Sequence, residues 1–287
     1  MFKLLLANLL EFNFFIFILT KGVKRMSSAK MKVLGKRELV FGEVNTETNT
    51  VKIRDNKFNA NEIQFDTPIT GTVFGTLLNY KGALERLGAV NNEPYNSPPI
   101  APVLYIKPAN TINRYGAAIP MPIGITKLEM GAALGLVIGK KAVAVDEETA
   151  LTYIAGYTIV NDVSVPHDSV FRPAVQHHAR DGFCPIGPWI IDRHDVDNPD
   201  DLTIRVFIND KLRQESSTSN LIRTVSRLLV DVTEFMTLSK GDVLLIGIPE
   251  EAPQAEVGDK IRIEITGIGS LENIILEETE INRRETI

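Results

Sequence analysis

Residues 157–162 read YTIVND, and residues 181–189 read DGFCPIGPW. The first stretch is an apolar run that ends in Asn161 and Asp162. An Asx residue at the end of a strand commonly forms a turn in which its side chain accepts backbone N–H groups. A carboxylate in that place can also be a ligand, so the residues alone leave both roles of Asp162 open. These two stretches carry more information on the fold than any other part of the chain.

Around these stretches the chain shows mostly the pattern of β-strands. Residues 32–65 alternate apolar and polar side chains between Asp- and Asn-rich turns, which predicts a small β-meander. Further strands are expected at Val103–Lys107, Leu134–Ile138, Asp242–Ile246 and Lys260–Ile265. Helical spacing is found in three segments, at 79–88, 146–155 and 221–236. Because strands and helices do not alternate, the sequence predicts a mainly β fold with peripheral helices (α+β) rather than a doubly wound sheet.

The composition is that of an ordinary globular protein and excludes some kinds of partner. The hydrophobic fraction is 44%, the charged fraction is 23% and the formal net charge is −5. Lys and Arg are scattered, so no nucleic acid is expected as a partner, because phosphate binding needs clustered cations. The single cysteine, Cys184, fits a reducing compartment, and we expect a cytoplasmic protein. Cys184 is interpreted as a buried small hydrophobe rather than a nucleophile.

The first residues differ from the rest of the chain. Residues 4–19 are almost wholly apolar and are followed by basic residues within 21–25. A signal peptide carries its positive charges first, and a membrane span is longer, so neither is the preferred interpretation. We expect residues 1–30 to be an extension outside the fold, with the folded protein starting near Met26 or Met31, and no membrane as a partner. A membrane anchor is the alternative.

The motifs of nucleotide-binding proteins and serine hydrolases are absent from the sequence. Three histidines are interleaved with three acids, a density that could form a transition-metal site: His167, His177 and His178, with Asp162, Asp168 and Asp181. Adjacent His177 and His178 point to opposite faces if the chain is extended, so at most one of them is expected in a given site. A dedicated histidine–metal site is therefore the less favoured interpretation.

Five ordered blocks carry a resemblance to a known enzyme family. They are Gly156–Ser164, Asp181–Trp189, Ile208–Asp210 followed by Gln214 and Thr218, Lys240–Pro249, and Gly258–Asn273. On these blocks the chain resembles the fumarylacetoacetate hydrolase family, which implies that family's mixed β-sandwich or roll. The implied organisation is an extension over 1–30, a small N-terminal β domain over 31–67, the family domain over 68–280 and a tail over 281–287.

Within the family, three segments are most similar to the isomerase/decarboxylases of 4-hydroxyphenylacetate (homoprotocatechuate) catabolism. They are Val163–Pro166, Phe171–Ala174 and Arg180–Gly182. The resemblance implies a small-molecule diacid substrate, either 5-oxopent-3-ene-1,2,5-tricarboxylate for decarboxylation or 2-hydroxyhepta-2,4-diene-1,7-dioate for isomerisation. Such enzymes are often two fused family domains, and this chain is similar to the first of them. The resemblance therefore implies a homodimer, or a heteromer with a paralogous family subunit.

The resemblance also implies a divalent metal, Mg²⁺ or Mn²⁺, as the family's cofactor. Active members hold it with a Glu-x-Glu pair and a later Asp, because hard cations prefer carboxylate oxygens. At the positions of the two glutamates this chain has Gly131 and Ala133, while Asp162 is the one retained ligand. Glu129 is the nearest carboxylate that could replace a missing one. These replacements make a metal site of the family's type the less favoured interpretation.

Catalytic and substrate-binding roles follow from the same resemblance. It implies His178, Arg180 and Asp181 as catalytic residues, and Asn79, Lys107 and Thr218 as substrate-binding residues. Histidine suits a general base near neutral pH, and Lys or Arg suits the binding of a substrate carboxylate. For His178 a hydrogen-bonded structural histidine is the alternative, and for Lys107 and Arg180 an ordinary salt bridge.

Two other functions stay open beside the isomerase/decarboxylase. The chain could be a catalytically silent subunit that pairs with a metal-competent paralogue, and the residues Gly131 and Ala133 favour this. It could also have a different family activity, such as acylpyruvate hydrolysis. The family's lid His and Glu, which would activate water, are Ala83 and Arg86 here, and this disfavours hydrolysis.

Overall fold

The computed structural model describes residues 26–90, 99–167 and 174–285, which form two β-sheets and a few helices. The strands are β1 Ser27–Val33, β2 Val40–Asn45, β3 Thr50–Ile53, β4 Asn56–Asn59, β5 Phe65–Asp66, β6 Val73–Leu77, β7 Val103–Lys107, β8 Ile112–Arg114, β9 Ala118–Met121, β10 Leu128–Ile138, β11 Ile154–Ser164, β12 Cys184–Asp192, β13 Thr203–Ile208, β14 Lys211–Ser217, β15 Val243–Leu245, β16 Gln254–Ala255, β17 Lys260–Ile265 and β18 Gly269–Glu277. The α-helices are α2 Lys81–Val90, α3 Val175–His178, α4 Val225–Phe235 and α5 Glu278–Glu285.

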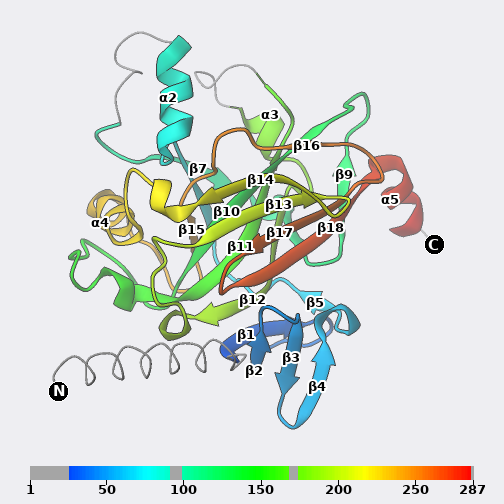
Figure 1. The fold of residues 1–287 in the computed structure, drawn as a ribbon, viewed down its shortest axis with the longest axis horizontal. Coiled ribbons are helices and arrows are strands. Elements are labelled where there is room, and N and C mark those ends of the chain that lie inside the picture. The colour runs from blue at the N-terminus through cyan, green and yellow to red at the C-terminus, as the bar shows by residue number, and fades with distance from the viewer. Residues whose placement is uncertain (1–25, 91–98, 168–173, 286–287) are drawn as a thin grey trace, which may run out of the picture.

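The larger sheet has 13 strands, and its main path runs β4-β3-β2-β1-β12-β11-β10-β15-β6-β7. The smaller sheet has five strands in the order β14-β13-β17-β18-β9. In Figure 1 the smaller sheet lies in front of β10 and β11, α2 and α3 lie in the upper part of the view, and α4 and α5 lie at opposite ends of the molecule. The mainly β fold with few helices confirms the predicted fold class.

Strands β10 and β11 form the centre of the fold because they are apolar on both faces. Leu134 and Leu136 of β10 point into the main core between the two sheets, where they pack with residues such as Ile263 of β17. The alternate residues Ala133 and Val137 point to a second, smaller core on the other face. Side chains alternate between faces along a strand, so each strand fills two apolar layers.

Two predicted strands, Val103–Lys107 and Lys260–Ile265, have the bounds that the sequence pattern indicates. The predicted helix over 221–236 begins later, at Val225, because the Thr224 side chain accepts the backbone N–H of Arg227 and caps the first turn. The predicted helix over 146–155 is wrong: only a 3₁₀ turn forms, at Ala150–Tyr153. Residues 147–149 form a turn before it, and β11 already begins at Ile154, where it pairs with Ile138 of β10, so strand pairing takes up the end of the predicted helix.

The N-terminal strands join the larger sheet through β1, which pairs with β12 so that Ala29 lies opposite Ile191. Residues 27–30, which were expected in the extension, are therefore part of the fold. The reason is packing, since Ala29 and Met31 on one face of β1 are buried. The expectations for residues 1–25, including the alternative membrane anchor, lie outside the described residues. The division into two domains stays a prediction.

Within the described residues, no helix has the length and apolar character needed to cross a membrane.

Candidate functional site

The centre of the candidate site is the buried carboxylate of Asp162, near the end of β11. Its Oδ1 atom lies 2.7 Å from Lys107 Nζ, and both side chains are 0% exposed. Its Oδ2 atom accepts a hydrogen bond from the hydroxyl of Tyr105. Tyr105 and Lys107 are alternate residues of β7 and therefore point to the same face of that strand. One strand thus supplies a partner to each oxygen of Asp162.

The ammonium of Lys107 has no hydrogen left for another partner. Besides Asp162, it donates to the backbone carbonyl oxygens of His178 at 2.8 Å and of Val163 at 3.3 Å. An ammonium has three donors, and all three are used. Lys107 therefore forms the salt bridge that the sequence left open as its alternative role. Binding a substrate carboxylate would require it to exchange one of these partners.

Tyr105 reaches Asp162 by lying directly over Gly75, its neighbour on β6. A Cβ atom at position 75 would be 1.9 Å from Cζ of the Tyr105 ring, so only glycine leaves room for it. Burial, and next the nearby Asp162 carboxylate, raise the pKa of Tyr105 well above its usual value. The hydroxyl therefore stays protonated and serves as a donor.

The imidazole of His178 lies beside this group, at the end of α3. Its Nδ1 is 4.0 Å from Asp162 Oδ1, its ring centroid is 5.9 Å from that of Tyr105, and its side chain is 23% exposed. Burial lowers the pKa of His178 to about 4, and the nearby Lys107 adds to this while Asp162 opposes it. The ring is therefore neutral at pH 7, and no described residue is a hydrogen-bond partner of its buried Nδ1. A neutral, partly exposed imidazole can accept a proton, but a pKa of about 4 makes it a weaker base than an ordinary histidine.

His177 and His178 lie in the short helix α3, so the opposite facing expected for an extended chain does not apply to them. Both contact His167: its ring is stacked on His177 with centroids 4.9 Å apart, and His178 meets it edge-on at 5.2 Å. The expectation that at most one of the two enters a given site stays a prediction. Even so, the described part of the chain has no group of three or more His, Cys, Asp or Glu arranged to hold a metal.

Arg180 and Asp181 follow α3 directly and make contacts of their own. Arg180 Nε donates to the carbonyl of Gln176 at 2.9 Å, and Asp181 Oδ1 accepts from Asn110 Nδ2 at 2.6 Å. Asn110 also binds the carbonyl of Ala179 at 3.1 Å. These contacts hold the end of α3 against the 3₁₀ turn at Ala109–Thr111. Arg180 is half-buried and Asp181 is exposed.

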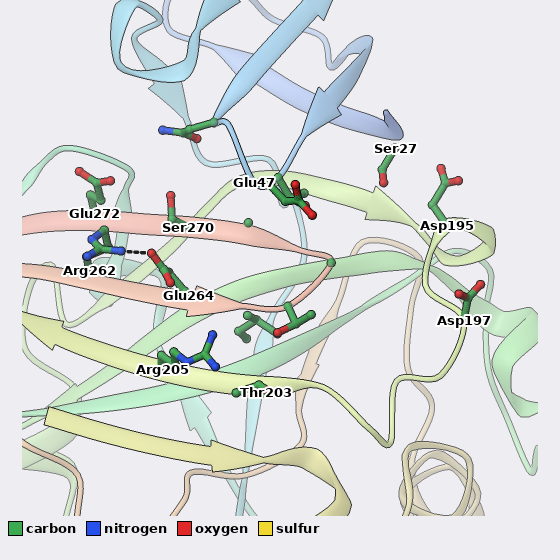
Figure 2. Close-up of a pocket in the computed structure, with 16 residues that line it drawn as sticks. Ser27, Glu47, Asp195, Asp197, Thr203, Arg205, Arg262, Glu264, Ser270 and Glu272 are labelled. Carbon is green, nitrogen blue, oxygen red and sulfur yellow. Dashed lines mark ion pairs between the residues drawn. The ribbon is translucent and has the colours of Figure 1, made fainter. Parts of the chain in front are cut away.

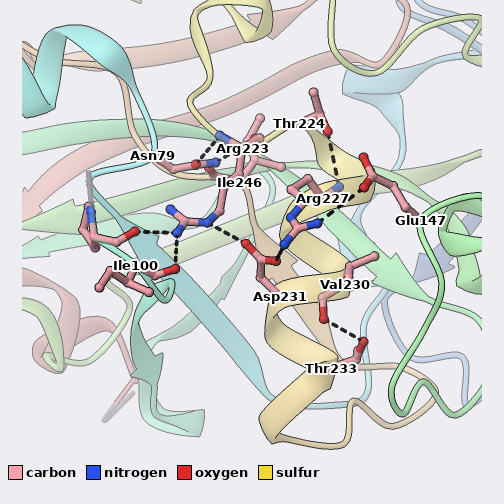
Figure 3. Close-up of polar contacts among 11 residues, drawn as sticks. Asn79, Ile100, Glu147, Arg223, Thr224, Arg227, Val230, Asp231, Thr233 and Ile246 are labelled. Carbon is pink, nitrogen blue, oxygen red and sulfur yellow. Dashed lines mark hydrogen bonds and ion pairs between the residues drawn. The ribbon is translucent and has the colours of Figure 1, made fainter. Parts of the chain in front are cut away.

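Asn79 and Thr218 are each held in backbone contacts. The Asn79 amide donates to the carbonyls of Ile246 at 2.8 Å and Arg223 at 3.2 Å, and its oxygen accepts the Arg223 N–H at 2.9 Å (Figure 3). Thr218 Oγ1 accepts the Leu202 N–H at 2.8 Å. None of these contacts involves Asp162. The structure thus brings Asp162, Lys107 and His178 together, while substrate binding by Asn79 and Thr218 stays a prediction.

A second charged group, also in Figure 3, holds the segment before α4. Arg223 Nε lies 2.8 Å from Asp231 Oδ2, and its Nη2 donates to the carbonyl of Ile100 at 2.9 Å. Asp231 is shared with Arg227, whose Nη2 is 2.8 Å from Oδ1. Arg227 in turn lies 3.6 Å from Glu147. This network is structural and is partly open to water.

The sequence reading missed Tyr105 and the buried polar atoms near α2. A signal for Tyr105 was present, since it precedes Lys107 by two residues on a predicted strand.

Gln214 Nε2 donates to the carbonyl of Glu250 at 2.6 Å, and this contact brings β14 to the segment after β15. Four buried atoms there have no hydrogen-bond partner among the described residues: Tyr80 OH, Gln214 Oε1, Ser216 Oγ and Glu250 Oε2. Such atoms are available to water or to a bound molecule.

A cleft of about 830 Å³ lies elsewhere, between the N-terminal strands and the smaller sheet (Figure 2). Arg205, Arg262, Glu264 and Glu272 point into it from the smaller sheet. Among these, Arg262 is paired with Glu264. None of the predicted site residues lines it. Its volume alone therefore does not identify it as the reaction site.

The residues around Asp162 offer few ligands to a divalent metal. Gly131 lies opposite Asp162 and Ala133 opposite Val160, so side chains at positions 131, 133 and 162 would share one face of the sheet. Carboxylates at all three positions would converge, but this chain has only one. A Cβ atom at Gly131 would lie 2.5 Å from the Asp162 carbonyl oxygen and 2.9 Å from Ile248 Cδ1. With both Asp162 oxygens already bonded, the residues present do not fit the metal.

Comparison with known proteins gives matches over most of the chain. The family model described as fumarylacetoacetate (FAA) hydrolase C-terminal matches residues 72–276. The 4-hydroxyphenylacetate degradation bifunctional isomerase/decarboxylase of Escherichia coli is 40% identical over 217 residues, which cover 75% of this chain and 49% of that protein. The chain thus spans about half the length of this relative.

Solved structures are similar as well. The 2-hydroxyhepta-2,4-diene-1,7-dioate isomerase of Mycobacterium marinum matches with a TM-score of 0.69 and 26% identity, covering 88% of this chain and 99% of that one. The maleylpyruvate hydrolase of Sphingobium sp. SYK-6, solved with manganese(II) ion and pyruvate, has a TM-score of 0.64 and 24% identity, with 77% of each chain covered. This last match shows a likeness of fold, and the bound manganese is a property of that protein.

Proposed function

Since the chain belongs to the fumarylacetoacetate hydrolase family, we propose that it is a subunit of an isomerase/decarboxylase in 4-hydroxyphenylacetate (homoprotocatechuate) catabolism. The proposed substrates are 5-oxopent-3-ene-1,2,5-tricarboxylate and 2-hydroxyhepta-2,4-diene-1,7-dioate. The observation that carries this proposal is the 40% identity over 217 residues to the E. coli bifunctional enzyme. Because the match covers half of that enzyme, a second copy or a paralogous family subunit would supply the other half. A cytoplasmic location goes with this role.

His178 is the residue best suited to the proton transfer that the isomerisation requires. Moving a double bond along a dienol needs a group that takes a proton at one atom of the substrate and returns it at another. The His178 ring is neutral at pH 7 and 23% exposed. Arg180, two residues further on, is the half-buried cation nearest in sequence and would bind a substrate carboxylate. No step is assigned to a divalent metal.

A catalytically silent subunit is the second candidate, and one observation favours it. The carboxylate that the family would use on a metal is neutralised by Lys107 at 2.7 Å in a pair with no exposure to water. A subunit of this kind would complete the assembly of a metal-competent paralogue without turning over substrate itself.

The test is turnover of 5-oxopent-3-ene-1,2,5-tricarboxylate by the purified full chain, followed by its ultraviolet absorbance. The assay is run with the chain alone, and with a co-expressed paralogue that has the intact Glu-x-Glu pair. His178→Gln keeps the size and polarity of the side chain and removes the titrating group, so it is the matched variant. The control is His194→Gln, the same substitution at an exposed histidine.

Turnover by the chain alone that falls at least tenfold in His178→Gln and persists in the His194→Gln control is the expected result. Turnover that requires the paralogue and is unchanged in His178→Gln would favour the silent subunit. No turnover under either condition, together with no co-purification of the two chains, would overturn both candidates.

A further inference from the structure

The ammonium of Lys107 occupies the position from which a metal would have to bind Asp162. Lys107 Nζ is 2.7 Å from Oδ1, and both side chains are completely excluded from water. A divalent cation at that oxygen would lie next to the ammonium, and repulsion between the two cations in a dry environment disfavours it. Relief of this repulsion would require the ammonium to give up its three acceptors.

Lys107 also cross-links three segments of the chain. Its stem comes from β7, and its three hydrogen bonds reach the Asp162 carboxylate and the Val163 carbonyl of β11, and the His178 carbonyl at the end of α3. These three segments are far apart in the sequence. One buried positive charge therefore holds the strand that carries Asp162 and the helix that carries His178 to the same edge strand.

The second oxygen of Asp162 is closed off by the same strand. Tyr105 donates its hydroxyl to Oδ2, and its ring fills the space over Gly75. On strand β10, Gly131 lies opposite Asp162, and Ile248 Cδ1 lies 2.9 Å from where a Cβ atom at Gly131 would be. An organic cation, a hydroxyl and an aliphatic side chain thus occupy the surroundings of Asp162.

We propose that Lys107 is the resident cation of this site. It takes over the place and the structural task of the family's divalent metal, so this chain folds and holds His178 without Mg²⁺ or Mn²⁺ and does not bind either ion at Asp162. The inference rests on Tyr105, Lys107 and Asp162 alone and is independent of the proposed substrates.

Metal binding is tested first, without any substrate. The full chain is dialysed against EDTA and titrated with Mn²⁺, while free Mn²⁺ is followed by electron paramagnetic resonance. The expected result is no saturable binding that depends on Asp162, and the same melting temperature in EDTA and in millimolar Mn²⁺. One Mn²⁺ bound per chain, and lost in Asp162→Asn, would overturn the proposal. Binding that Asp162→Asn leaves intact would support it, because the ion would then lie elsewhere.

The pairing is tested by the variants Lys107→Met, Asp162→Asn and their combination. Lys107→Met leaves a buried carboxylate with no cation, and Asp162→Asn leaves a buried ammonium with no anion, so each single variant is expected to lower the melting temperature. The double variant contains no buried charge and is expected to recover at least half of the loss of Lys107→Met. The control is the exposed pair Lys52–Glu43, at 3.3 Å, where Lys52→Met is expected to change little.

If Lys107→Met yields no folded protein, the double variant still decides the matter. A folded double variant supports the proposal. A double variant as unstable as Lys107→Met, or a Lys107→Met variant that melts like the natural chain, would overturn it.

Discussion

The two buried charge networks of this protein look alike in distance and differ in their access to water. Lys107 Nζ lies 2.7 Å from Asp162, and Arg223 Nε lies 2.8 Å from Asp231. The first pair is 0% exposed on both sides, whereas the side chains of the second are 12% and 11% exposed. Asp231 also has a second cation, Arg227, while the one cation that the described residues provide to Asp162 is Lys107. The burial of a pair and the number of cations at its carboxylate, rather than the distance, decide how much stability is lost when one partner is removed.

The largest effect is expected when the dry pair is broken. Lys107→Met leaves Asp162 charged and buried with the Tyr105 hydroxyl as its remaining donor, and we expect a loss of about 3–5 kcal/mol in the free energy of unfolding. Urea unfolding followed by circular dichroism measures it. A loss below about 1 kcal/mol would mean that water reaches Asp162 and that the two networks are equivalent.

A pH dependence is expected next, and it belongs to the Asp162 site. The pKa of His178 is lowered from 6.5 to about 4 in the folded protein, with burial as the main cause, Lys107, His167 and His177 acting in the same direction and Asp162 against them. Between pH 6.5 and 4 the unfolded chain therefore binds a proton that the folded chain does not. The free energy of unfolding should fall by about 2–3 kcal/mol as the pH falls through this window. Above the window the contribution of His178 is constant.

Comparison with His178→Gln isolates this slope from that of the acids. Asp200 and Glu272 have raised pKa values, mainly because of burial, and their contribution to stability has the opposite sign at low pH. The natural chain and His178→Gln both contain these acids, so the difference between their curves of stability against pH reports His178 alone. Parallel curves between pH 4 and 6.5 would show that His178 titrates as it does in the unfolded chain.

A smaller effect is expected in the network that water reaches. Arg223→Met removes the salt bridge to Asp231 and the hydrogen bond to the Ile100 carbonyl, but Asp231 keeps Arg227. We expect a loss of about 1–2 kcal/mol in the free energy of unfolding. The double variant Arg223→Met/Arg227→Met should lose more than the sum of the two singles, because only then is Asp231 left without a cation. If the losses of the two single variants simply add, the second cation at Asp231 does not compensate for removal of the first.

The smallest effect is expected at the wall of the cleft in Figure 2. Arg205 Nε lies 2.6 Å from Glu215, yet the two side chains are 41% and 52% exposed. Glu215→Gln is expected to change the free energy of unfolding by about 0–1 kcal/mol, and less in high salt, because exposed pairs are screened. Urea unfolding at two salt concentrations measures it. A loss as large as that of Lys107→Met would show that short distance alone determines the strength of a pair.

Part of the fold and of the site was predictable because it depends on local patterns. Alternation of apolar residues marked β7 and β17, and helical spacing marked α2 and α4. The helix expected over 146–155 does not form, because acidic residues at its start and a few apolar residues stabilise a helix less than the neighbouring strands stabilise the observed structure. The directions of the His177 and His178 side chains depended on the backbone conformation, which the sequence left open and which is helical in the structure.

The sequence by itself determined the family, the mainly β class and the absence of a carboxylate from positions 131 and 133. These are properties of residue identity and of short-range order. Only the tertiary structure decided that Lys107 and Tyr105 are the partners of Asp162. Strand β7 precedes Asp162 by more than fifty positions, and strand order in a sheet is set by packing and long-range hydrogen bonds. A salt bridge between such distant residues leaves no periodic trace in the sequence, so its discovery required the folded chain.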